Sequence, residues 1–147
     1  MSNTTSDGIS LSDWDKLGDL AADLANEESD IQCEAIRKKI LIYLNGLTKK
    51  YGNRASIFAT KSDYVKPLLM KERLLLFSYD LTEDGDLKNK TMISSSLADL
   101  YIDEQENYAK GHHWLDVLEE NLKNYFDKHE NSNFERLKVE LQKIKKS

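Results

Sequence analysis

The stretch that decides the fold class is residues 29–52, SDIQCEAIRKKILIYLNGLTKKYG. Its apolar side chains recur at three- and four-residue steps, the period of an α-helix with one buried face: Ile36, Ile40, Tyr43, Leu44, Leu47 and Tyr51. Ser29 followed by Gln32 is a capping-box pattern, and Gly52 stands where left-handed C-caps are common. We therefore predict one long helix between Ser29 and Gly52.

The same period extends to both sides of this helix. Trp14, Leu17, Ala21 and Leu24 predict a helix over about residues 13–28, capped by Ser10 with Asp13 or by Ser12 with Asp15. Residues 53–66 suit a short helix that breaks near Pro67. Further helices are predicted over residues 88–106 and 108–129. A last helix is expected to be capped by Ser132 and Glu135 after a break at Asn131–Asn133.

Residues 68–81 carry apolar side chains on nearly every face, as a helix buried centrally in a bundle does. The alternative is a β-hairpin in which residues 73–81 and 87–94 pair across Asp84-Gly85. Lys88, Asn89 and Lys90 are weak strand formers, which favours the helix.

Composition supports one helical domain. The chain has 147 residues, which suits a single domain, and only one proline and six glycines, too few for a β-rich fold. We predict an all-α domain over residues 9–147, built as an antiparallel helical bundle or a short helical-hairpin array of six to seven helices, with residues 1–8 as a flexible tail. The polar N-terminus lacks a secretory pattern and no apolar run approaches the roughly 20 residues of a membrane span, so a cytoplasmic protein is expected.

Residues 94–124 resemble one tetratricopeptide-like helical hairpin. Leu97, Ala98 and Tyr101 match the first helix of that motif, and Trp114 falls where its second helix carries an aromatic. Lys110 and Val117 depart from the motif, which prefers small residues there, and Leu122 replaces its closing proline. The resemblance implies a helical hairpin in this fifth of the chain.

The residues that could support chemistry are few. Asp80 to Asp86 fill the first positions of a calcium-binding EF-hand loop, but Thr91 replaces the glutamate that completes it. His112, Asp116 and Glu119 lie at steps of four and three on one helix face, without a second histidine on that face. We therefore expect no cofactor and no enzymatic activity, and keep a metal-dependent enzyme using the His112 face as an alternative.

Acidic residues are concentrated at the N-terminus. Residues 1–30 hold eight acids and one lysine, whereas the rest of the chain holds eighteen acids and twenty bases. Four carboxylates repeat at four-residue steps: Asp15, Asp19, Asp23 and Glu27. Asp99, Asp103 and Glu106 form a second predicted row. The basic stretch Lys49–Arg73 is explained by balance against the acidic helix, so no nucleic-acid partner is expected.

Acidic helix faces either keep a protein soluble or attract a basic partner. In size and local acidity the chain is similar to immunity proteins, which neutralise bacterial toxins. This similarity implies a non-catalytic inhibitor that pairs the two acidic rows with basic residues of a toxin, with Trp114 as an aromatic anchor. The alternative is an adaptor or chaperone that binds a peptide in a groove around Tyr101 and Trp114.

Overall fold

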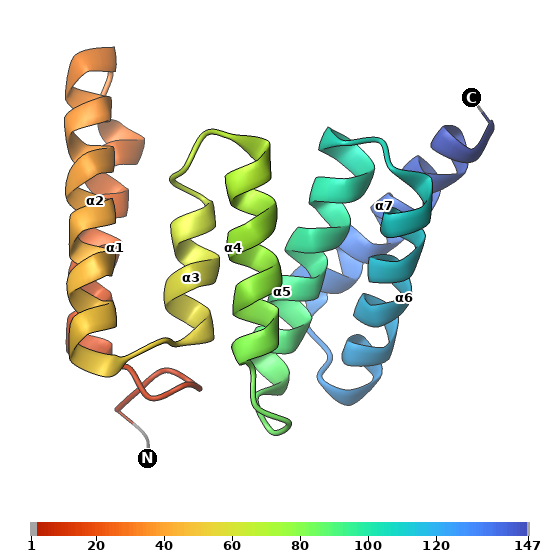
Figure 1. Ribbon diagram of the computed structural model, residues 1–147, viewed down its shortest axis with the longest axis horizontal. Coiled ribbons are helices and arrows are strands. Elements are labelled where there is room, and N and C mark those ends of the chain that lie inside the picture. The colour runs from red at the N-terminus through yellow and green to blue at the C-terminus, as the bar shows by residue number, and fades with distance from the viewer. Residues whose placement is uncertain (1–2, 147) are drawn as a thin grey trace.

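The computed structural model describes residues 3–146 and is all-α, without a strand among these residues. Seven α-helices pair into successive antiparallel hairpins, α1 with α2, α3 with α4 and α5 with α6, and α7 packs against the last of them (Figure 1). Their bounds are α1 Leu11–Asn26, α2 Asp30–Tyr51, α3 Ala55–Ser62, α4 Leu68–Leu81, α5 Leu87–Asp99, α6 Tyr108–Asn124 and α7 Lys128–Lys146. The predicted fold class and helix number are confirmed, and residues 68–81 are a helix.

Several helix ends lie where their capping residues predict. The Ser29 side chain accepts a hydrogen bond from the backbone N–H of Gln32 at the start of α2, and Gly52 ends that helix with φ of +84°. Pro67 precedes α4, where its missing N–H costs no helical hydrogen bond. The capping box predicted at Ser10 is wrong, because Ser10 makes no side-chain cap and Asp13 instead accepts from Lys50 and Tyr51.

The break predicted at Asn131–Asn133 is also wrong. The chain breaks at residues 125–127, and the Asp127 carboxylate accepts from the backbone N–H of Glu130 to cap α7. Asn133 lies inside α7 because its amide donates to Ser95 Oγ at 2.8 Å and to Asp99 Oδ2 at 3.2 Å on α5. Hydrogen bonds to a distant helix here outweigh the low helix propensity of asparagine.

The core runs along the array as three neighbouring clusters. In the first cluster, buried residues of α1 and α2 pack on Ile57 of α3. In the second, buried residues of α3 and α4 pack on Leu97 of α5. In the third, buried residues of α5 pack on α6 and α7. Trp114 contacts the last two clusters. Because each fully buried aliphatic side chain contributes about 1.5–3 kcal/mol, apolar burial ties each hairpin to the next.

Helix α5 continues into one wide turn, η1, over Leu100–Glu104. The N–H of Gln105 donates to the carbonyl of Leu100 at 2.9 Å, five residues earlier, as in a π-helix. Leu100, Tyr101 and Ile102 are all buried there, although an ordinary amphipathic helix rarely buries three successive residues. Tyr101 lies four residues after the buried Leu97 and so shares the core-facing side of α5, and the wide turn coincides with the additional burial of Ile102.

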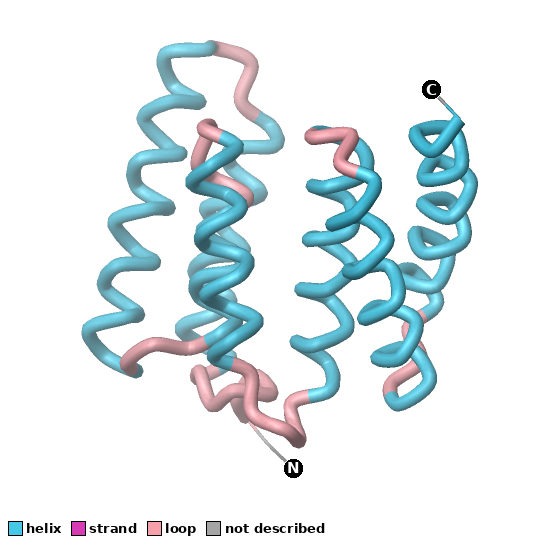
Figure 2. Tube along the Cα trace, turned by 45° about the vertical axis from the view of Figure 1, so that its right-hand side comes forward, coloured by secondary structure: helices cyan, strands magenta, loops and turns pink. Residues whose placement is uncertain are grey.

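The N-terminal segment, residues 3–10, lies against the starts of α3 and α5. Ser6 Oγ donates to Asp86 Oδ1 at 2.8 Å, and the Asp7 carboxylate accepts from the backbone N–H and the hydroxyl of Ser56 at 2.8 and 2.9 Å. Figure 2 shows this segment beside the loop between α4 and α5. Its polar composition predicts a flexible tail over residues 1–8, of which 1 and 2 lie outside the described residues. Within this segment, the Asp7 carboxylate caps α3, Ser6 contacts Asp86, the N-cap residue of α5, and Thr5 bonds locally to Asp7 and to the backbone N–H of Ile9.

Candidate protein-binding groove

A groove crosses the face of the array that α1, α3 and α5 form. It consists of three adjoining hollows, of about 640 Å³ between α1 and α3, about 180 Å³ between α1, α3 and α5, and about 170 Å³ between α3, α4 and α5. Trp14 and Thr60 line both the first and the second hollow, and Asp63 and Ser96 line both the second and the third. In Figure 1 this side faces away from the viewer, behind α2, α4 and α6.

Three carboxylates of α1 lie beside this groove. Asp15 and Asp19 line its first hollow, and Asp23 follows one turn later. All three are exposed, and no ion pair or hydrogen bond in the described part of the chain uses their side chains. Asp13 differs, because Lys50 and Tyr51 donate to it and these hydrogen bonds lower its pKa. Asp15, Asp19 and Asp23 therefore have no ion-pair partner among the described residues, and Lys16 is the one base on the same helix.

Glu27 does not continue this row. The α-helix ends at Asn26, and Glu27 is extended with φ of −87° and ψ of 131°. Its carboxylate accepts from the backbone N–H of Ser29 at 3.1 Å, which ties it to the turn before α2. The predicted row of four carboxylates is thus a row of three.

Asp63, at the end of α3, adds a carboxylate to the second and third hollows. Much of the residue is open to solvent, yet the groove walls displace enough water to raise the pKa of Asp63, with Lys71 acting weakly in the other direction. No cation lies within ion-pair distance of it among the described residues. Asp63 was not among the predicted site residues, because it stands in the basic stretch Lys49–Arg73, where seven bases outnumber two acids.

No protein-family model matches this chain, and neither curated proteins nor solved structures gave a match. None of the helices in the described residues has the length and apolar character that crossing a membrane requires.

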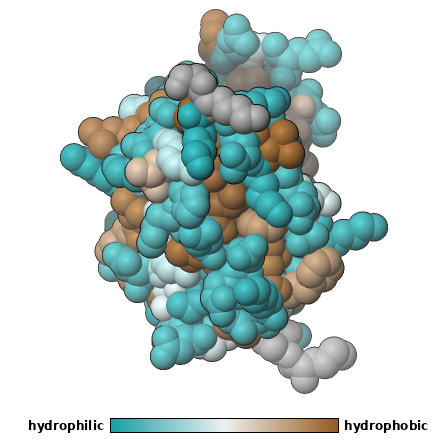
Figure 3. All heavy atoms as spheres, turned by 90° about the vertical axis from the view of Figure 1, so that its right-hand side faces the viewer, coloured by the Kyte–Doolittle hydropathy of each residue, from teal (hydrophilic) through white to brown (hydrophobic). Residues whose placement is uncertain are grey.

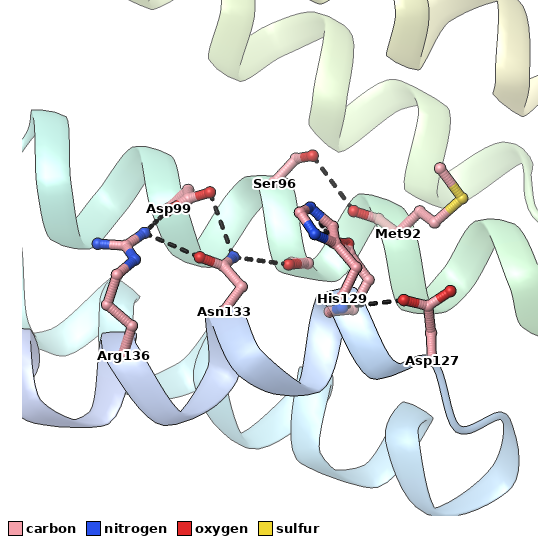
Figure 4. A network of polar contacts seen from close by, with 9 residues as sticks. Met92, Ser96, Asp99, Asp127, His129, Asn133 and Arg136 are labelled. Atoms are coloured by element: carbon pink, nitrogen blue, oxygen red, sulfur yellow. Dashed lines mark hydrogen bonds and ion pairs between the residues drawn. The ribbon is translucent and has the colours of Figure 1, made fainter.

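The second predicted acidic row has a structural role. Arg136 of α7 contacts Asp99 Oδ1 at 2.6 Å and Asp103 Oδ2 at 2.9 Å, and Asn133 also donates to Asp99 (Figure 4). Partial burial and the neighbouring Asp103 raise the pKa of Asp99, while Arg136 opposes them. Glu106 lies beyond η1 at φ of +49° and so does not share the helical face of the other two. These contacts hold α7 against α5.

The two predicted aromatic contact residues pack into or against the core. Tyr101 is 2% exposed, and its hydroxyl donates to Glu72 Oε2 at 2.6 Å. Burial, together with Glu72, raises its pKa. Trp114 is half-buried and packs edge-on against Tyr79, with ring centroids 5.0 Å apart. The structure does not bring either ring into the groove, whose aromatic lining residues are Trp14 and Tyr64.

The His112 face lies at the α6–α7 end of the molecule. His112 Nδ1 is 3.2 Å from Asp116 Oδ2, and both line a hollow of about 490 Å³ together with Glu119. Figure 3 views this end, where apolar side chains show between hydrophilic ones. Within the described residues, no three His, Cys, Asp or Glu side chains lie close enough together to hold a metal ion.

Proposed function

We propose that the protein acts without catalysis, by binding another protein with a basic surface, as an immunity-type inhibitor of a bacterial toxin would. The observation that carries this proposal is the row of Asp15, Asp19 and Asp23 beside a groove, in which no carboxylate forms an ion pair with a described residue. Opposed potentials of this kind speed encounter and orient the two partners before they touch.

The stability cost of the row supports the same proposal. Carboxylates four residues apart on a helix repel one another by about 0.2–0.5 kcal/mol per pair. Asp15 with Asp19 and Asp19 with Asp23 make two such pairs, and no cation of the described residues contacts them. Charge repulsion that the fold does not relieve is expected at sites that bind a partner.

The test is charge reversal with a matched control. The double variant Asp19→Lys/Asp23→Lys changes the row, and Asp80→Lys/Asp84→Lys makes the same change in net charge at exposed positions outside the groove. The partner is purified from the host by capture on the wild-type protein at low salt, and association with each variant is measured across a salt series.

We expect the Asp19/Asp23 variant to associate at least about tenfold more slowly and with a flatter salt dependence, because steering of this kind accelerates encounter by roughly 10–1,000-fold. The Asp80/Asp84 variant should stay close to wild type. Equal effects of the two variants would contradict the proposed role of the row.

A peptide-binding adaptor is the second candidate function, and the groove itself favours it. Tyr101 cannot serve as its contact residue because its ring is buried. This candidate would be favoured if the Asp19→Lys/Asp23→Lys variant still captured a peptide and a variant with a filled groove did not. A metal-dependent enzyme would instead show stoichiometric metal that disappears in His112→Ala.

A further inference from the structure

The second hollow of the groove has the size of a side-chain site. Its volume of about 180 Å³ is below the roughly 300–1,000 Å³ of pockets that hold small molecules. It adjoins the other two hollows and shares lining residues with each, so a polypeptide lying along the groove could place one side chain in it.

The walls of this hollow combine an aromatic ring, an apolar chain and a carboxylate. Trp14 comes from α1, Met92 from α5 and Asp63 from α3. Met92 is 44% exposed, so a large part of this apolar residue is accessible to solvent. A flat cation with an apolar stem fits such walls, because a guanidinium stacks on aromatic rings and pairs with carboxylates.

The charges along the groove also favour a cation. Lys88 lines the second hollow and Lys71 the third. Against these two bases stand four carboxylates without an ion pair among the described residues, namely Asp15, Asp19, Asp63 and Glu104. Asp99 also lines the third hollow, but Arg136 already neutralises it.

We propose that the groove binds a basic segment of the protein partner by taking one arginine side chain into the hollow between Trp14, Met92 and Asp63, while further bases of that segment pair with Asp15 and Asp19. This inference rests on the proposed function. It adds to it the place and the chemical class of the contact.

The floor of the hollow allows the groove to be closed without touching its charges. Ser56, Ala59 and Thr60 of α3 are small, and this leaves the space open. Thr60→Trp fills the space, whereas Asp63→Asn keeps the space and removes the charge. The second variant should fold at least as stably as wild type, because burial disfavours the Asp63 carboxylate.

The probe is an eleven-residue peptide with lysines near both ends and one central arginine. Its matched control carries citrulline in place of arginine, which keeps the shape and loses the charge. Binding at low salt is measured by amide chemical shifts of the labelled protein. We expect the arginine peptide to shift Thr60, Asp63 and Ser96 and to bind about tenfold more tightly than the citrulline peptide.

We expect Thr60→Trp to abolish this preference for arginine and Asp63→Asn to reduce it at least fivefold, with thermal unfolding confirming that both variants are folded. Equal binding of the two peptides, no binding to wild type, or full arginine preference in both variants would overturn the inference. If one of these results were obtained and partner capture still depended on Asp19 and Asp23, the proposed function would stand without this inference. Loss of that dependence would refute the proposed function separately.

Discussion

Removing the Asp7 side chain should destabilise the whole fold. Asp7 supplies the cap that α3 lacks locally, because the N-cap residue Arg54 makes no side-chain cap bond. Loss of a cap costs about 1 kcal/mol, and loss of the Ser56 hydroxyl bond costs about a further 1 kcal/mol. At 2–4 °C per kcal/mol for a chain of this size, Asp7→Ala should lower Tm by roughly 4–8 °C. Thermal unfolding followed by circular dichroism measures this.

The control for Asp7→Ala is Asp15→Ala, which removes a carboxylate without a hydrogen bond and should leave Tm nearly unchanged. A double-mutant cycle of Asp7→Ala with Ser56→Ala isolates the bond between the two side chains, for which we expect a coupling of about 0.5–1.5 kcal/mol. If residues 1–8 behave as a flexible tail, Asp7→Ala will match Asp15→Ala and the coupling will vanish.

Two further predictions concern stability. Gly111→Ala should destabilise the fold by about 1 kcal/mol, because the added Cβ would lie 2.6 Å from Ile102 Cγ1. Gly46→Ala adds a Cβ with no atom within 4 Å and should stabilise the fold by up to about 1 kcal/mol. Equal denaturation midpoints of the two variants would refute this. Hydrogen bonds from Arg37 lower the pKa of Glu34 to about 2, so this contribution to stability is present above pH 4.5 and is lost as the pH falls toward 2. Arg37→Gln should therefore flatten the acid limb of a pH–Tm profile.

Local patterns were enough to predict the helices. The apolar period, the Ser29 cap and the Gly52 and Pro67 breaks depend on neighbours within four residues, and the corresponding helix ends agree with the structure. The error at Asn131–Asn133 has a different cause. Asn133 is held by Ser95 and Asp99, more than thirty residues earlier in the chain, and no local rule contains such a pair.

The proposed binding groove was only half predictable. Asp15 and Asp19 follow from the period of a single helix, so their exposure could be inferred from the sequence. Trp14, Thr60 and Met92 become neighbours only when three hairpins pack. Tyr101 shows the opposite failure. It lies four residues after the buried Leu97, so its burial follows from the helical period, yet it was expected to contact a peptide.

The two acidic rows are similar in sequence but differ in electrostatic environment. Asp99 and Asp103 share one arginine of α7, so their attraction for a cation is already satisfied and contributes to the packing of α7. The row on α1 lies on the first helix of the array, where only Asp13 reaches a lysine of α2. Repulsion among its three remaining carboxylates persists in the folded state, since no cation of the described residues contacts them. A molecule that brings positive charge to the groove relieves this repulsion, which the described fold leaves in place.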